Sequence, residues 1–170
     1  MGSSSFGPYV GTRGGSQPYA EKYSVVPKVL AIDKNNPNVY KKNKGYFHNP
    51  TAVNIEKSNV YGKIKIDNKD AHGTMTYVLD TKGNMIVGKR FNPYNNTGKA
   101  PHPTLIGGKN PKVQCAGMIT FRKGKIVSID NDSGHFRPDI KSMKKVYKYL
   151  KKLNNKRPDL FSNKFDWGKQ

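Results

Sequence analysis

Two stretches of the sequence have the pattern of a β-hairpin, and they constrain the fold more than any other feature. Residues 74–80, TMTYVLD, and 84–91, NMIVGKRF, are rich in β-branched and other apolar side chains and flank the turn sequence TKG. Residues 113–121, VQCAGMITF, and 125–130, KIVSID, repeat the arrangement around RKG. Strand-like runs joined by a short turn that contains glycine predict antiparallel hairpins. We therefore expect the two hairpins to form one twisted antiparallel sheet.

A single amphipathic helix is predicted after the second hairpin. Asp139 stands in the position of a helix cap, directly after Pro138. Apolar residues then recur at spacings of three and four, as on one face of an α-helix. They are Ile140, Met143, Val146, Tyr147, Leu150 and Leu153. The sequence thus predicts an α+β fold: a twisted antiparallel sheet with a C-terminal basic amphipathic helix packed on it.

The domain organisation of the chain is predicted from its length and from the distribution of Gly, Ser and Pro residues. Residues 1–20 are rich in Gly, Ser and Pro without periodicity, which predicts a flexible leader or linker. Residues 21–170 are predicted to form a single domain. The one cysteine, Cys115, lies in an apolar run and is predicted to be buried. The sequence contains no run of about 18 apolar residues, so we expect no membrane span.

The charge of the chain points to a polyanionic partner. The sequence has 31 Lys and Arg residues against 11 Asp and Glu residues, a formal net charge of +20. Such an excess destabilises a compact state through self-repulsion, so a function that favours it is expected. The candidate partners are a nucleic acid, an anionic membrane surface and an acidic protein. The alternative is a lysine-rich surface that serves solubility alone.

Two histidines stand in unusual settings. His102 lies between two prolines, and His135 belongs to the stretch NDSGHFRPD at 131–139. Cleavage of RNA without a metal needs a base, an acid and a cation, and histidine suits both proton-transfer roles at neutral pH. We expect both rings to be exposed near strand ends. The alternative is that Pro-His-Pro is a rigid turn and Ser-Gly-His a strand exit.

The other residues of such a site are predicted from their chemistry. Arg137 would stabilise negative charge, and the hydroxyls of Ser133 and Thr104 would bind phosphate oxygens. The polar side of the predicted helix would hold the nucleic-acid backbone. Its lysines are Lys141, Lys144, Lys145, Lys148, Lys151 and Lys152.

Two other chemistries find less support in the sequence. Asp130, Asp132 and His135 could ligate a hard cation, but acidic residues in a turn are more often structural. An ADP-ribosyltransferase would need a catalytic glutamate, and the chain has Glu21 and Glu56. We therefore expect neither a metal nor another cofactor.

The residues around the two histidines also carry a resemblance. HPTLIGG at 102–108, followed by CAGMITFRKGKIVSIDNDSGHFRP at 115–138, resembles a module at the carboxy ends of bacterial polymorphic toxins. The segment YVGTRGGSQPYAEKY at 9–23 and the lysine-rich style are similar to the toxic domains of wall-associated Rhs/YD-repeat proteins of Gram-positive bacilli. A similar His…Ser-Gly-His segment occurs in plant calmodulin-binding proteins, where the motif would mark a fold rather than a catalytic pair.

The toxin resemblance implies a function and its partners. It implies a tRNA nuclease that inhibits growth on contact, is carried by a larger secreted, cell-wall-associated protein and acts in the cytoplasm of the target cell. The partners would be tRNA and an acidic cognate immunity protein that neutralises the toxin. The alternatives are an ADP-ribosyltransferase toxin and a non-catalytic basic module that binds nucleic acid or protein. The sequence does not indicate an oligomeric state.

Overall fold

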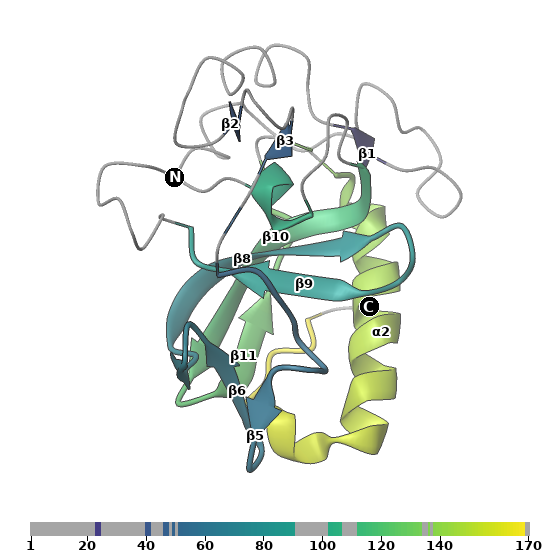
Figure 1. Cartoon of the computed structure of the whole chain (residues 1–170). Coiled ribbons are helices and arrows are strands. Elements are labelled where there is room, and N and C mark those ends of the chain that lie inside the picture. The colour runs from purple at the N-terminus through teal and green to yellow at the C-terminus, as the bar shows by residue number, and fades with distance from the viewer. Residues whose placement is uncertain are drawn as a thin grey trace.

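A computed structural model of the chain describes the two hairpins, the helix and the segments that pack on them (Figure 1). The described residues are 23–24, 40–41, 46–47, 49, 51–90, 102–106, 112–133, 136 and 138–168. The predicted leader at 1–20 and the candidate site residues His135 and Arg137 lie outside them.

The two predicted hairpins pair into one antiparallel sheet, as expected. The central strands are β8 (Gly73–Asp80) and β10 (Lys112–Arg122), which lie side by side; β9 (Met85–Gly88) follows β8, and β11 (Lys125–Ile129) follows β10. The sheet order is β1-β10-β8-β9-β4, in which β1 is Tyr23–Ser24 and β4 is Val53–Asn54, and β11 also pairs with β10. The short strands β2 (Tyr40–Lys41) and β3 (Tyr46–Phe47) form a separate pair.

The predicted helix is present and packs on the sheet. Asp139 caps the 3₁₀ turn η3 (Ile140–Ser142) by accepting a hydrogen bond from Lys141 N at 3.0 Å, and α2 continues over Met143–Lys156. The predicted apolar face is buried at Met143, Val146, Leu150 and Leu153. Ile140 is an exception, with 63% of its surface exposed. It lies in a 3₁₀ turn, where three residues per turn replace 3.6 and the α-helical periodicity no longer selects the buried face.

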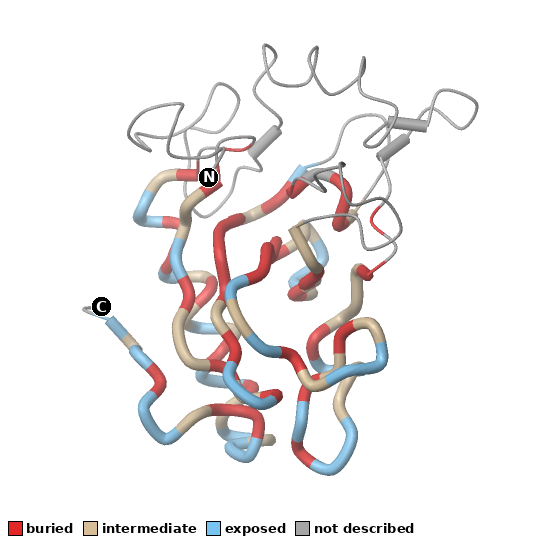
Figure 2. Tube along the Cα trace, turned by 90° about the vertical axis from the view of Figure 1, so that its left-hand side faces the viewer, coloured by how far each residue is buried: buried red, intermediate tan, exposed pale blue. Residues whose placement is uncertain are grey.

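Most residues of β8 and β10 are buried, and they contribute to two apolar cores. Figure 2 shows buried stretches through the middle of the molecule and exposed ones at its periphery. The larger core joins one face to α2 and includes Tyr77, Leu79 and Cys115. A smaller core on residues of the opposite pleat contains Val78, Val113 and Ala116, together with Leu105 of η2 (His102–Leu105) and Phe136. The segments that carry the two histidine motifs therefore supply this second core.

The C-terminal segment folds back onto the body. After η4 (Pro158–Leu160), Phe161 forms a parallel bridge with Ile126 of β11. The rings of Phe161 and Trp167 stack with centroids 5.7 Å apart, and Phe165 meets Trp167 edge-on at 4.5 Å. These rings close one end of the larger core.

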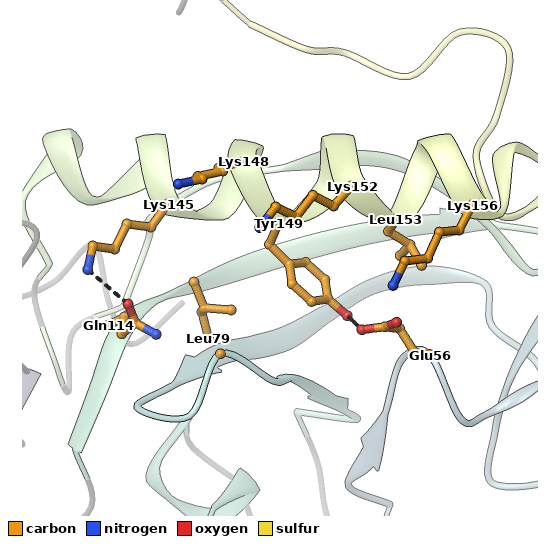
Figure 3. Close-up of a pocket in the computed structure, with 10 residues that line it drawn as sticks. Glu56, Leu79, Gln114, Lys145, Lys148, Tyr149, Lys152, Leu153 and Lys156 are labelled. Atoms are coloured by element: carbon orange, nitrogen blue, oxygen red, sulfur yellow. Dashed lines mark hydrogen bonds between the residues drawn. The ribbon is translucent and has the colours of Figure 1, made fainter.

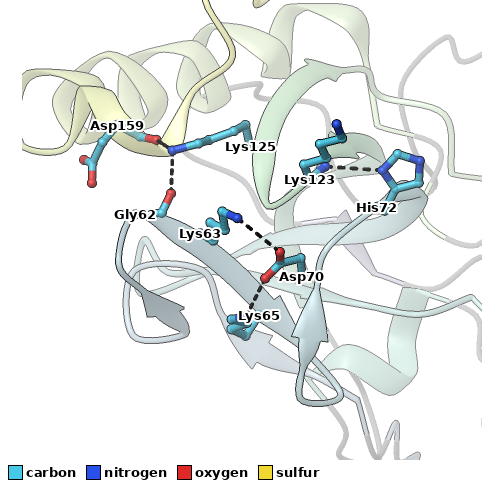
Figure 4. A network of polar contacts seen from close by, with 8 residues as sticks. All are labelled: Gly62, Lys63, Lys65, Asp70, His72, Lys123, Lys125 and Asp159. Carbon is cyan, nitrogen blue, oxygen red and sulfur yellow. Dashed lines mark hydrogen bonds and ion pairs between the residues drawn. The ribbon is translucent and has the colours of Figure 1, made fainter.

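A three-stranded sheet of β5 (Asn59–Val60), β6 (Lys63–Ile66) and β7 (Lys69–Asp70) is tied to the main body by polar contacts (Figure 4). Lys125 donates to Gly62 O at 2.8 Å and also to the carbonyl of Asp159 in η4. Within the small sheet, Lys65 and Lys63 both pair with the Asp70 carboxylate, and the hydrogen bond from Lys65 is the main cause that lowers the pKa of Asp70. The network joins the small sheet, the β10–β11 turn and η4.

Candidate nucleic-acid interface

A groove runs along α2 where the helix lies beside the end of β8, the β8–β9 turn and the start of β10 (Figure 3). The cavity has a volume of about 390 Å³. Its cationic lining comes from four lysines at spacings of three and four on one side of α2. They are Lys145, Lys148, Lys152 and Lys156. The opposite wall comes from the strands and the segment around Glu56.

The end of the groove at Lys145 is built by a chain of hydrogen bonds. Lys145 Nζ donates to Gln114 Oε1 at 3.0 Å, and Gln114 Nε2 donates to Asp80 O at 2.8 Å. Because Gln114 is engaged at both ends of its amide, it fixes the ammonium group of Lys145 over β10. A fixed cation loses less side-chain entropy when it binds an anion.

The other end of the groove holds a tyrosine–carboxylate pair. Tyr149 OH donates to Glu56 Oε2 at 2.6 Å and joins α2 to a segment 93 residues earlier in the chain. Burial, followed by the hydrogen bond and charge of Glu56, raises the pKa of Tyr149 well above its ordinary value. The phenol therefore stays protonated at neutral pH and holds the carboxylate in place.

The groove separates the predicted lysines into two groups. Lys145, Lys148 and Lys152 line it, whereas Lys141 in η3 and Lys144 and Lys151 in α2 are exposed outside it. Lys156 and Glu56 also line the groove, and neither is predicted from the sequence as part of a nucleic-acid site. The spacing signal for Lys156 is present, since it follows Lys152 by one helical turn, but the last apolar residue of the predicted face is Leu153. Nothing local indicates Glu56.

His102 is buried, so the expectation of an exposed ring is wrong for this histidine. Its exposed fraction is 5%, and its Nε2 lies 2.7 Å from Gly117 O of β10. A carbonyl oxygen only accepts hydrogen bonds, so this contact requires the proton on Nε2. The ring thus anchors η2 to the sheet.

Gly117 is a point of close backbone approach beneath η2. A Cβ atom at this position would lie 2.0 Å from Asp130 O. The Asp130 side chain accepts hydrogen bonds from Met118 N at 2.8 Å and Asp132 N at 2.9 Å, and Tyr77 OH donates to its carbonyl. The acidic turn therefore organises the exit from β11. In the described part of the chain, no group of three or more His, Cys, Asp or Glu side chains is arranged to hold a metal ion.

The hydroxyl residues of the two motifs are also buried. Thr104 is 2% exposed and Ser133 is fully buried. Ser133 Oγ accepts a hydrogen bond from Phe136 N at 3.3 Å, and the Phe136 ring fills the second core beside Leu105 and Ala116. The structure therefore brings together η2, the middle of β10 and the segment after β11. His135 and Arg137 lie outside the described residues, so their distance from His102 stays untested.

Cys115 is buried, as predicted, and has no features of a nucleophile. It is fully buried, and burial raises the pKa of its thiol to about 11. Ser142 Oγ donates to its sulfur at 3.1 Å. A neutral thiol within the core contributes packing rather than reactivity.

The fold and the groove define a basic α+β domain in which a lysine-lined helix covers an antiparallel sheet. Residues 52–143, more than half of the chain, match the family model of the IQ motif-containing protein middle domain. The chain belongs to this family. No curated protein and no solved structure matches it.

The residues around the two histidines lie within the matched range, whereas the lysines of the groove lie outside it. It runs from the residue before β4 to the first residue of α2, so it includes His102, Gly117, Ser133 and Glu56. The four groove lysines lie beyond its end. The buried motif therefore lies within the matched range, and the lysines of the groove lie in the part of α2 that follows it. In the described residues, no helix is long and apolar enough to cross a membrane.

Proposed function

We propose that this domain binds tRNA through the α2 groove and cleaves it without a metal. The groove carries the proposal: four lysines line one cavity, and the only acidic side chain among its lining residues is Glu56. Ammonium groups in such a row suit successive phosphates of a nucleic-acid backbone. The net charge of +20 would speed the encounter with a polyanion.

The proposed chemistry is acid–base transfer between His102 and His135, with Arg137 stabilising the developing charge. The buried positions of Ser133 and Thr104 favour a supporting role for their hydroxyls over direct contact with phosphate. The contact between His102 Nε2 and Gly117 O would hold the ring in a fixed orientation in this site. Each proton-transfer group of this kind contributes roughly 10²- to 10⁴-fold in rate.

The proposed biological role is that of a contact-dependent toxin. The domain would be part of a larger secreted, wall-associated Rhs/YD-repeat protein and would act in the cytoplasm of the target cell. An acidic immunity protein would neutralise it in the producing cell. The similarity of residues 102–138 to polymorphic toxins and the strongly basic surface support this role.

A non-catalytic RNA-binding module is the second candidate. The buried hydrogen bond of His102 to a backbone carbonyl favours it, because this bond gives the histidine a structural purpose without catalysis. The groove would then bind RNA, and the motif would only shape the domain.

The deciding experiment combines cleavage and stability. Purified protein is incubated with total tRNA with and without EDTA, and fragment ends are mapped for the wild type, His102→Ala and His135→Ala. The catalytic proposal predicts EDTA-insensitive cutting that falls about 10²-fold or more in each variant, with His135→Ala keeping its melting temperature. Binding without any scission supports the module, and the absence of binding contradicts both candidates.

A further inference from the structure

The groove contains features that a simple phosphate site does not need. Its floor includes the apolar side chains of Leu79 and Leu153 and the ring of Tyr149, and Glu56 stands at one end (Figure 3). A carboxylate repels phosphate, so Glu56 opposes the attraction that the lysines provide. A ligand that meets all of these groups must combine an anion, a flat apolar surface and hydrogen-bond donors.

The Tyr149–Glu56 pair presents a pre-oriented acceptor. An ionised carboxylate offers about four lone-pair positions, and Tyr149 OH occupies one of them on Oε2 at 2.6 Å. The other positions can accept donors from a ligand. Among the RNA bases, guanine alone carries two adjacent parallel donors, N1–H and the 2-amino group, on one edge. This edge matches the two oxygens of a carboxylate, as in other bidentate pairs.

The size and lining of the cavity also suit one base. Its volume of about 390 Å³ falls in the range of roughly 300–1,000 Å³ that is typical of small-molecule sites. Proteins that read single-stranded RNA accept an unstacked base against apolar or aromatic side chains and hydrogen-bond its Watson–Crick edge. The ring of Tyr149 and the two leucines provide such a floor between the lysines and Glu56.

We propose that the groove is a subsite for one unpaired guanine of an RNA strand. Glu56 accepts hydrogen bonds from N1–H and the 2-amino group, Tyr149 positions the carboxylate, and Lys148, Lys152 and Lys156 bind the flanking phosphates. The inference rests on the proposed function, because it takes RNA as the ligand. It assigns base selectivity to a residue outside the histidine motifs.

The test is a binding measurement with uncleavable ligands. Fluorescein-labelled pentaribonucleotides carry 2′-O-methyl groups throughout, which block attack by the 2′-oxygen, and differ only in a central guanine, inosine or adenine. The wild type should bind the guanine ligand about tenfold more tightly than the adenine ligand, with inosine between them because it lacks the 2-amino group.

Two variants that each remove one negative charge distinguish a specific effect of the Glu56 carboxylate from an effect of net charge. In Glu56→Gln the amide oxygen still accepts from Tyr149, but the amide nitrogen faces the guanine donors, so the preference should fall below about twofold while adenine binding is kept. Asp166→Asn makes the same charge change on the C-terminal segment and should keep the preference; its amide oxygen can still accept from Gly168 N.

The outcomes distinguish this inference from the proposed function. Equal binding of all three ligands by the wild type, or a preference that survives in Glu56→Gln, overturns the guanine subsite and leaves RNA binding intact. Failure to bind any of the ligands overturns the inference together with the proposed function. A guanine-specific loss in Glu56→Gln supports the inference, because unchanged adenine binding shows that the fold is preserved.

Discussion

Gly117 sits where three parts of the molecule meet. Its carbonyl receives the His102 hydrogen bond, and the backbone of Asp130 passes so close that a Cβ atom would lie 2.0 Å from the Asp130 carbonyl oxygen. The neighbouring atoms are backbone, which cannot move as a flexible side chain does. The absence of a side chain at this one position allows the two histidine motifs to approach the sheet.

We predict that Gly117→Ala lowers the free energy of unfolding by about 3 kcal/mol or more, at the upper end of typical overpacking costs. Gly88→Ala is the matched control in β9 of the same sheet, where the nearest atom to the new methyl group would be Leu105 Cδ2 at 2.8 Å. A leucine side chain can shift, so the loss there should be smaller. Denaturant midpoints measure both variants, and equal losses would contradict this account.

Cys115 leads to a prediction about pH. Burial raises the pKa of its thiol from 9.0 to about 11, so the thiol ionises in the unfolded chain before it does so in the folded one. Its contribution to stability is complete below pH 9 and is lost as the pH rises toward 11, by up to about 1.4 kcal/mol per pH unit. Cys115→Ala should therefore show a shallower fall of the free energy of unfolding over this range. Identical slopes would show that another group governs the decline.

At the scale of the element, α2 has three functions. Its apolar face closes the larger core, Tyr149 binds Glu56, and one row of lysines lines the groove. Lys144 and Lys151 of the same helix lie outside the groove. Replacing them changes the net charge as much as replacing two groove lysines does, so they serve as a control.

We predict that replacing Lys148 and Lys152 together by alanine weakens RNA binding and lowers the slope of log affinity against log salt by about 1.4 to 1.8 units. The control replaces Lys144 and Lys151, which changes the net charge equally but lies outside the groove. Affinity is measured by fluorescence anisotropy at several salt concentrations. If both double variants weaken binding equally, the net charge of the helix, and not the groove, determines the affinity.

At the scale of the whole molecule, charge opposes stability. A net charge of +20 on 170 residues destabilises a compact state through self-repulsion, and salt screens this repulsion over a length that falls from about 30 Å at 0.01 M to about 8 Å at 0.15 M. We predict that the melting temperature rises with sodium chloride over this range. Calorimetry at fixed pH checks it, and a constant or falling melting temperature would show that attractive ion pairs outweigh the repulsion.

The sequence alone determined the helix and the four strands of the two hairpins, but not the short strands β1 and β4 that extend the sheet. The hairpins at 74–91 and 113–130, the cap at Asp139 and the buried stripe of α2 are encoded by side-chain periodicity and turn residues within about 15 positions of each other. These signals are local, so they are readable without knowledge of the rest of the chain.

Only the tertiary structure decided which side chains are buried and which distant segments come into contact. His102 has the residue type and setting of a surface turn, yet η2 covers one face of the sheet, and its ring is buried on Gly117. Glu56 joins the groove only because β4 and α2 are brought together around the core, which places its carboxylate 2.6 Å from a hydroxyl 93 residues away. Burial and such long-range contacts depend on how the elements pack, and packing is a property of the whole chain that no local pattern contains.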